Sequence, residues 1–325
     1  MQPLSHALSS AQDKVADGLT RATGPDNDAT IALNTAFMTD GAIMRIADGA
    51  ALEKPLLIVF AVAGATAQLT TVRNVIAAGA GATATIIEAH VRLERAASGQ
   101  TNTLTELTVG KAATLAHIKI AAGDGSGVHL ANWNVSLGRD ATYRGFQYTS
   151  GQALARNQIN AVYAGEGGKL DVSGAYLVRG KEHVDTTLVV DHAVPHCESR
   201  ELFKGVLDDR GRGVFQGKII VRPDAQKTDG KQMAQALMLS PDAEFDSKPE
   251  LEIYADDVVC GHGTTSAELD SDLLFYCMSR GIPENEARAL LIESFVGEAL
   301  DKVEHDGLRA ALSGWATAWL SAAKS

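Results

Sequence analysis

A cysteine and a histidine two residues apart are the first candidates for chemistry in this 325-residue chain. In an extended segment, the side chains of Cys260 and His262 leave the backbone on the same face. Gly261 and Gly263 leave room for another chain to approach closely. A thiolate and an imidazole are suitable ligands for iron, but two ligands do not complete a four-coordinate site. A metal ion or cluster here would need ligands from a second subunit. The alternative is that both side chains pack at a structural junction, because a Cys-x-His pair is a weak motif.

A second group of possible ligands lies in the segment Asp191–Cys197, which holds two histidines and a cysteine in close succession. His192 and His196 would share one strand face while Cys197 points to the other, so the three cannot readily converge on one ion. Pro195 favours an edge or a bend over a central strand. We interpret the segment mainly as a structural corner, with thiol or sulfur transfer at Cys197 as the alternative.

The glycine- and lysine-rich run from Phe203 to Lys218 does not form a phosphate-binding loop. Such a loop needs a glycine, four further residues, a Gly-Lys pair and then Ser or Thr. Arg212 occupies the place of that first glycine, and Ile219 follows the pair. We therefore expect two strands joined by a turn at 208–211, and no ATP hydrolysis by this chain.

The elements that position these residues are predicted by a turn signal that recurs along the middle of the chain. It begins at Gly110, Gly138 and Gly165, and each time two variable residues, a small residue and then a large one follow. Alternating stretches such as 83–91 and 128–135 lie between the signals and are typical of strands. A nearly constant repeat of this length predicts stacked units that bury a shared face, which is a β-solenoid. An ordinary β-sandwich with turns at chance spacing is the alternative.

Both ends of the chain predict helices. Residues 4–19 fit one amphipathic helix, and a turn at 24–28 separates it from the strands. After Gly263 the period becomes helical, and Pro283 suits the first turn of a second helix. The expected faces of the three C-terminal helices are Leu269, Leu273, Tyr276 and Cys277; Ala287, Leu290, Leu291, Ser294 and Phe295; and Leu308, Leu312, Trp315 and Trp319. We divide the chain into an N-terminal helical segment (1–28), a β-helix core (29–258) and a C-terminal helical domain (259–325).

Composition indicates a soluble cytoplasmic protein. No apolar stretch approaches the roughly eighteen residues of a membrane span, and the N-terminus lacks the basic start and apolar stretch of a secretory signal. Cys197, Cys260 and Cys277 are too few and too scattered for a disulfide framework, which fits a reducing compartment. The formal net charge of -11 argues against nucleic acid as a partner.

Several segments in one order between Arg200 and Ile282 resemble a known family signature. The segments are Arg200–Asp208, Gly213–Ile219, Ala225–Gly230, Asp246–Asp257, Cys260–Thr265 and Leu274–Ile282, with weaker agreement extending upstream to about Asn34–Phe37. Together they resemble the SufB/SufD family of iron-sulfur cluster assembly scaffolds, and its SufD members more than its SufB members. SufD-like proteins usually carry a longer helical region before the core, whereas only about thirty residues precede it here.

The resemblance implies a right-handed parallel β-helix in a non-enzymatic scaffold subunit of the SufBCD complex. It implies pairing with SufB through the β-helix and binding of the ATPase SufC through the C-terminal helices. His262 matches the SufD histidine that faces a SufB cysteine at the nascent cluster, with Cys260 as a neighbouring candidate ligand. The iron-sulfur cluster would be transient and shared with SufB, so this chain alone would hold no cofactor stably. In isolation, the chain could pair with a second copy through the same edge.

Two other assignments would give different properties. A SufB-type scaffold shares the fold, but its turn before the last helices resembles Glu-His-Glu, whereas this chain has Cys260–Gly263. A β-helix carbohydrate-active enzyme needs clustered carboxylates in a groove lined with aromatic side chains. Only 5% of the residues are aromatic, and no carboxylate cluster recurs on successive coils. Co-purification with SufB and SufC, against activity on polysaccharides, separates the scaffold from the enzyme.

Overall fold

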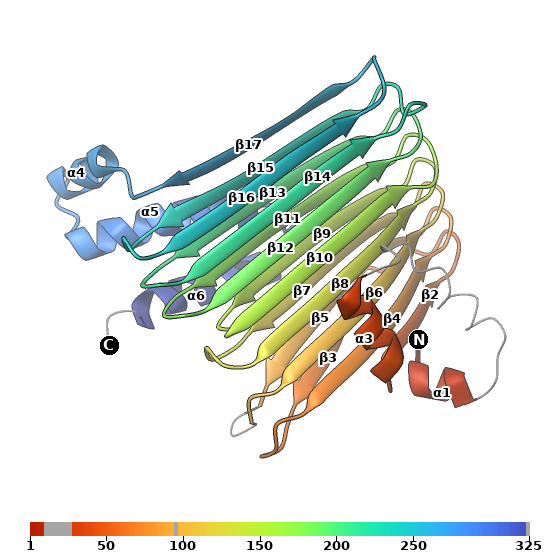
Figure 1. Ribbon diagram of the computed structural model, residues 1–325, viewed down its shortest axis with the longest axis horizontal. Helices are drawn as coiled ribbons and strands as arrows, with labels where there is room; N and C mark the ends of the chain where they lie inside the picture. Colours follow the sequence, from red (N-terminus) through yellow and green to blue (C-terminus); the bar gives the residue numbers. More distant parts are fainter. Residues whose placement is uncertain (10–27, 94–96, 323–325) are drawn as a thin grey trace.

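Two facing sheets of mainly parallel strands form an elongated solenoid in the computed structural model, which describes residues 1–9, 28–93 and 97–322 (Figure 1). The chain alternates between the sheets, so that from the second strand onward even-numbered strands build one sheet and odd-numbered strands build the other. Neighbouring strands run parallel, except that β1 pairs antiparallel with β2. The predicted parallel β-helix is therefore confirmed.

The two sheets differ by one strand. The nine-stranded sheet contains, in spatial order, β1 (Gln2–Pro3), β2 (Ala42–Ile46), β4 (Leu69–Ala78), β6 (Gln100–Val109), β8 (Val128–Leu137), β10 (Leu154–Tyr163), β12 (His183–His192), β14 (Arg212–Val221) and β16 (Glu244–Ile253). The eight-stranded sheet contains β3 (Leu56–Val62), β5 (Thr83–Arg92), β7 (Thr114–Ala122), β9 (Thr142–Ser150), β11 (Lys169–Val178), β13 (Glu198–Leu207), β15 (Asp229–Met238) and β17 (Val259–Ala267). β13 and β14 are the two strands predicted on either side of the turn at 208–211.

Close contact between successive coils explains the recurring turn signal. A Cβ atom at Gly110 would stand 2.7 Å from the Ala78 carbonyl oxygen, and one at Gly165 would stand 2.2 Å from the Arg139 nitrogen. Glycine therefore begins each turn because the backbone of the preceding coil leaves no space for a side chain. The third residue of each signal has a positive φ: 53° at Ala112, 55° at Asp140 and 73° at Gly167.

The core lies between the two sheets, where alternate residues of each strand point inward. Its largest fully buried aromatic side chains are Trp133, Tyr143, Tyr163, Phe203 and Phe215. Burying a side chain of this size stabilises the fold by roughly 1.5–3 kcal/mol relative to exposure. The stacked aromatic and aliphatic side chains thus hold successive coils together.

The N-terminal helices are α1 (Leu4–Ser9) and α3 (Ala29–Phe37). The carboxylate of Asp28 caps α3 by accepting hydrogen bonds from the Thr30 and Ile31 nitrogens. Buried Asn34 ties α3 to the nine-stranded sheet by donating to the Val72 carbonyl oxygen at 2.9 Å. α1 confirms the first residues of the helix predicted over 4–19, and residues 10–27 lie outside the described part of the chain.

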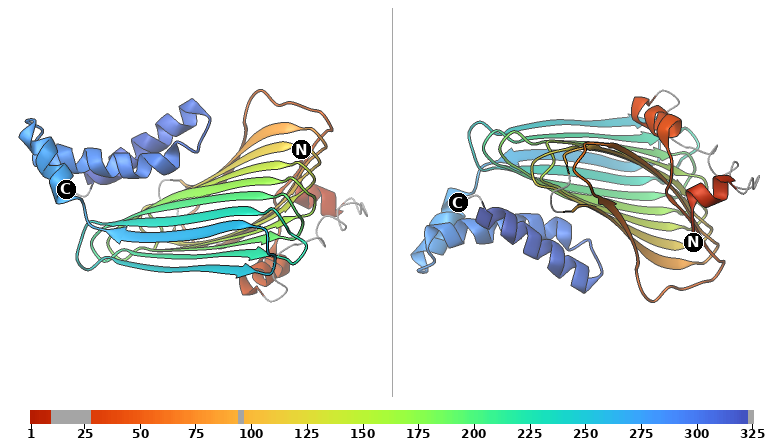
Figure 2. Two further views of the ribbon diagram at one scale, coloured as in Figure 1. Left: turned by 90° about the horizontal axis from the view of Figure 1, so that it is seen from above. Right: turned by 90° about the horizontal axis from the view of Figure 1, so that it is seen from below.

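The C-terminal helices are α4 (Ser271–Ser279), α5 (Glu284–Leu300) and α6 (Asp306–Ala322). α5 and α6 lie on the outer face of the eight-stranded sheet, where α5 contacts β11 and β13, and α4 packs on α5 (Figure 2). Buried Lys204 on β13 pairs with Glu298, and its ammonium lies 4.3 Å from the centre of the Phe295 ring. The predicted C-terminal helical domain, 259–325, includes strand β17, and its helices begin at Ser271. The division of the chain into domains stays a prediction.

Candidate functional site

Cys260 and His262 lie on β17, the last strand of the eight-stranded sheet. Cys260 is opposite Gly230 and His262 is opposite Gln232 on β15. Gly230 and Gln232 are buried, so the residues aligned with them also face the space between the sheets. The Thr264 hydroxyl, two residues further on, lies 3.0 Å from that of Ser247 on β16. The predicted common face of Cys260 and His262 is thus the inner face of the last coil.

The end of the solenoid gives the two side chains different surroundings. His262 is exposed, because no described strand follows β17 in its sheet. Cys260 is half-buried beside the apolar cluster that includes Ile219 and Val221. Burial raises the pKa of the Cys260 thiol, a hydrogen bond from the Gly230 backbone lowers it, and the negative charge of Asp229 raises it further.

The two residues do not form a complete metal site by themselves. Among residues 1–9, 28–93 and 97–322, no group of three or more His, Cys, Asp or Glu side chains is arranged to hold a metal ion. A thiolate and an imidazole offer two of the four ligands of a tetrahedral site. An ion or cluster held by these two residues would need further ligands.

The segment Asp191–Cys197 is a corner of the solenoid and lies apart from the Cys260–His262 pair. β12 ends at His192, and His196 adopts a positive φ of 60°. The His192 ring stacks on Tyr163 with 4.5 Å between ring centres. Cys197 is fully buried, and its sulfur lies 3.7 Å from the Gly165 carbonyl oxygen. Burial raises the pKa of this thiol, so the geometry favours a packing role.

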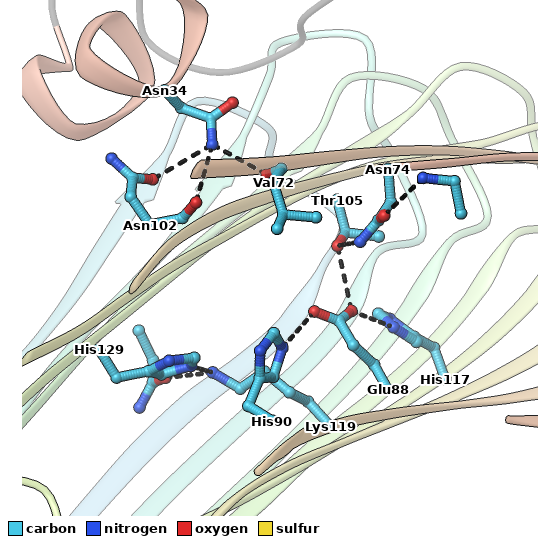
Figure 3. A network of polar contacts seen from close by, with 12 residues as sticks. Asn34, Val72, Asn74, Glu88, His90, Asn102, Thr105, His117, Lys119 and His129 are labelled. Atoms are coloured by element: carbon cyan, nitrogen blue, oxygen red, sulfur yellow. Dashed lines mark hydrogen bonds and ion pairs between the residues drawn. The ribbon is translucent and has the colours of Figure 1, made fainter. Parts of the chain in front are cut away.

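A buried group of charged side chains near the first coils was missed by the sequence analysis (Figure 3). Glu88 on β5 is fully buried, and its oxygens lie 2.6 Å from His90 Nε2 and 3.1 Å from His117 Nε2. The Thr105 hydroxyl donates to the same carboxylate at 3.1 Å. Burial opposes the ionisation of Glu88, but the hydrogen bonds from the two histidines outweigh it and hold its pKa well below the usual range. Glu88 is therefore a buried carboxylate with three donors.

Lys119 and His129 continue this group toward the opposite sheet. Lys119 Nζ lies 3.4 Å from His129 Nε2 and donates to the Asn157 side chain. Burial lowers the pKa of Lys119 to about 7, although the charge of Glu88 acts in the opposite direction. Burial and the charges of Lys119 and His90 hold the pKa of His129 well below its usual range. The group thus consists of two hydrogen-bonded sets, around Glu88 and around Lys119, and the rings of His90 and His129 meet between them with 4.7 Å between their centres.

The sequence does hold a signal for this group. Glu88 and His90 occupy inward positions of β5. On β7, one coil later, Lys119 is opposite Glu88, and His117 is opposite Ile86, the inward residue before Glu88. Charged residues at core positions of adjacent coils indicate a buried polar network. The signal can be recognised only when the register between the coils is known.

Comparison with known proteins identifies the family to which this solenoid belongs. The sequence matches the family described as "SUF system FeS cluster assembly, SufBD core domain" over residues 60–295 and that described as "SufBD protein N-terminal region" over residues 1–58. The chain belongs to the SufBD family. It is SufD-like, because it is 35% identical over 259 residues to the iron-sulfur cluster assembly protein SufD of Escherichia coli. That match covers 79% of this chain and 61% of the relative.

Two further relatives of this SufBD family member have similar coverage. A SufBD family iron-sulfur cluster assembly protein of Synechocystis is 31% identical over 281 residues, which cover 83% of this chain and 62% of the relative. A SufBD family protein of Mycobacterium leprae is 34% identical over 224 residues, which cover 66% of this chain and 57% of the relative. The chain thus spans about three fifths of the length of these curated relatives.

The C-terminal helices of this SufBD family member expose a second candidate surface. Four large apolar or aromatic side chains of α4 are between 42% and 72% exposed: Leu273, Phe275, Tyr276 and Met278. On α5, Leu290 is 50% exposed, whereas Leu291 and Phe295 are half-buried. In the part of the chain that the structure describes, no helix is long and apolar enough to cross a membrane.

Proposed function

We propose that this SufD-like chain is a non-enzymatic scaffold subunit for iron-sulfur cluster assembly. It pairs with a SufB-type subunit and contributes His262 to a cluster site at their interface. The position of Cys260 and His262 carries the proposal, because both face inward on the last coil, where the solenoid ends. The cluster is the cargo of this site; it is bound transiently and shared with the partner, and Cys260 is the second candidate ligand.

The edges of β16 and β17 support pairing with another solenoid. Each is the last strand of its sheet, so one side of each strand has no neighbouring strand among the described residues. Exposed strand edges present backbone donors and acceptors that can pair with another chain. A SufB-type β-helix docked here would bring its own ligands opposite His262. In isolation, a second copy of this chain would use the same edges.

The exposed face of α4 supports binding of a SufC-type ATPase. Contiguous exposed apolar side chains mark protein interaction surfaces. Residues Leu273 to Met278 provide such a face, together with Leu290 on α5. Phe295 contributes less to this face, because it packs partly against the cluster on the outer face of the sheet and its ring lies beside the Lys204 ammonium. The three free thiols are consistent with the cytoplasmic location that we propose.

Reconstitution with the cognate SufB-type and SufC-type subunits tests the cluster site. We expect His262→Ala to form the complex normally and to lose the visible absorption of the assembled cluster. His183→Ala is the control, because His183 lies on β12, two strands away from the β16 edge of its sheet. Undiminished cluster formation by His262→Ala would contradict the ligand role, and failure of the wild type to bind the SufB-type subunit would contradict the scaffold role.

A second substitution tests the helical surface separately. Phe275→Ser should weaken binding of the SufC-type subunit while leaving the SufB-type subunit bound. Leu57→Ser is the matched control, because Leu57 is 60% exposed on β3, at the opposite end of the solenoid. Equal SufC binding by the two variants in a pull-down would exclude α4 as the docking surface.

A further inference from the structure

Glu201, Gln232 and His262 are aligned on three successive strands that lead to the open end of the solenoid. Glu201 on β13 is opposite Gln232 on β15, and Gln232 is opposite His262 on β17. Adjacent strands lie about 4.8 Å apart, so these side chains stack as one ladder. Glu201 and Gln232 are each 3% exposed, whereas His262 is exposed. The ladder therefore connects the core to the proposed ligand.

The buried part of this ladder has acceptors but too few donors. Neither oxygen of Glu201 nor the Oε1 atom of Gln232 makes a hydrogen bond with any residue that the structure describes. The Gln232 amide nitrogen donates to the Gly217 carbonyl oxygen at 3.4 Å. The Ser199 hydroxyl, two residues from Glu201, is already 3.1 Å from His192 Nε2. Buried acceptors without a donor carry an uncompensated desolvation penalty. One additional proton on Glu201 would provide the missing donor.

We propose that Glu201 and Gln232 are positioning residues for His262. The carboxyl group of Glu201 donates its proton to Gln232 Oε1, and the second lone pair of this oxygen accepts the N–H of the His262 ring. The other ring nitrogen is then left with its lone pair directed away from Gln232. Histidine ligands are commonly fixed in this way, because a partner on the second nitrogen selects the tautomer and the ring orientation.

The surroundings of Glu201 favour the protonated carboxyl group. Burial raises the pKa of Glu201 to about 8, and this exceeds the lowering by the nearby Ser199 hydroxyl, whose hydrogen-bond partner is His192, and by the charge of the Arg200 guanidinium. The charge of Asp171 raises it further. Tyr163 and Cys260 are the other titratable groups coupled to Glu201, and both are uncharged at neutral pH because burial raises their pKa values. The carboxyl group therefore keeps its proton near neutral pH.

The end of the Gln232 side chain packs against Gly217 on the opposite sheet. A Cβ atom at Gly217 would stand 2.2 Å from Gln232 Oε1, so glycine leaves room for the amide in its present position. One coil earlier, the residue aligned with Glu201 is Val172, which is buried and apolar. At this level, Gly145 and Val172 separate His117 on β7 from the last three strands. Those last three strands carry polar side chains in succession, ending at His262.

Nitrogen NMR of the isolated, histidine-labelled chain tests the ladder without any partner. We expect the neutral His262 ring to be a single tautomer in the wild type and a tautomer mixture in Gln232→Leu. Glu201→Gln should retain the single tautomer, because its amide can still donate to Gln232. Glu201→Leu should show a lower population of that tautomer, because leucine donates no hydrogen bond. The His183 signals provide the internal control, and thermal unfolding confirms that each variant is folded. A tautomer mixture in the wild type, or no change in Gln232→Leu, would overturn the proposal.

The consequence for cluster assembly rests on the proposed function and is measured separately. In the reconstituted complex, Gln232→Leu should reduce the cluster yield severalfold without reducing complex formation. If the NMR tautomer changes but the cluster yield does not, the ladder is present and the ligand role of His262 is wrong. If the tautomer does not change, the ladder is wrong whatever the ligand role of His262.

Discussion

Glu88 and Glu201 occupy similar positions and have opposite surroundings. Both are buried, inward-facing residues of the eight-stranded sheet. Glu88 accepts hydrogen bonds from His90, His117 and Thr105, whereas Glu201 has no hydrogen-bond partner among the described residues. The pKa of Glu88 is held well below its usual range, and burial raises that of Glu201 to about 8. The same side chain is thus an anion in the first coils and a neutral acid in the last coils.

The difference shows which buried polar groups indicate function. A buried polar group whose hydrogen bonds are made stabilises and specifies a core, and the Glu88 carboxylate, with donors from His90, His117 and Thr105, meets that description. An unpaired buried polar group requires another explanation, such as a missing partner or a functional role. Proximity to the exposed residue His262 makes Glu201 the more informative of the two glutamates, although the group around Glu88 contains more titratable residues.

Replacing Glu88 should produce the largest loss of stability. Glu88→Ala leaves His90, His117 and Lys119 buried without their carboxylate, and breaking a buried ionic group in this way costs about 3–5 kcal/mol. The free energy of unfolding from urea titration provides the measurement. Glu166→Ala is the control, because it breaks an exposed pair with Arg139 and should cost at most about 1 kcal/mol. Equal losses in the two variants would contradict the structural role of Glu88.

The two glutamates should also change stability with pH in opposite directions. The folded chain keeps the Glu201 proton between about pH 4.5 and 8 while the unfolded chain loses it, so stability falls as pH rises through this window. The slope from this residue is at most about 1.4 kcal/mol per pH unit. Glu201→Gln should remove it. Glu88 contributes the opposite slope below about pH 4.5, where stability is lost on acidification. Urea unfolding of the wild type and of Glu201→Gln across pH 4 to 9 separates the contribution of Glu201 from that of Glu88. The same dependence of the unfolding free energy on pH in both proteins would contradict a protonated Glu201.

The sequence predicted the features that depend on local periodicity. The turns beginning at Gly110, Gly138 and Gly165 predicted the solenoid because each glycine meets the preceding coil at a fixed spacing. The two-residue separation of Cys260 and His262 predicted their common face. The ladder from Glu201 to His262 could not be predicted, because its members are brought together only by the register between coils. The exposure of His262 likewise depends on β17 being the last strand, which no local pattern reveals.

Thiol reactivity should distinguish the interior from the open end. Burial raises the pKa values of both Cys197 and Cys260, but Cys197 is fully enclosed. Because the thiolate is the reactive form, we expect alkylation of native chain to proceed at Cys277 first, at Cys260 more slowly and at Cys197 only after unfolding. Mass spectrometry of timed samples provides the order. Labelling of Cys197 in the folded chain at the rate of Cys277 would show that the corner at Asp191–Cys197 opens.

The smallest effect should come from His262 itself. Its ring is exposed at the edge of the last coil, and Glu201 still donates to Gln232 in its absence, so His262→Ala should change the free energy of unfolding by no more than about 1 kcal/mol. His117→Ala, by contrast, removes a fully buried ring that contacts Glu88 and Tyr143 and should cost several times as much. Urea unfolding of the two variants side by side tests the contrast. A large loss in His262→Ala would mean that the residue closes the core, and its position at the open end would then be explained by packing and not by a ligand role.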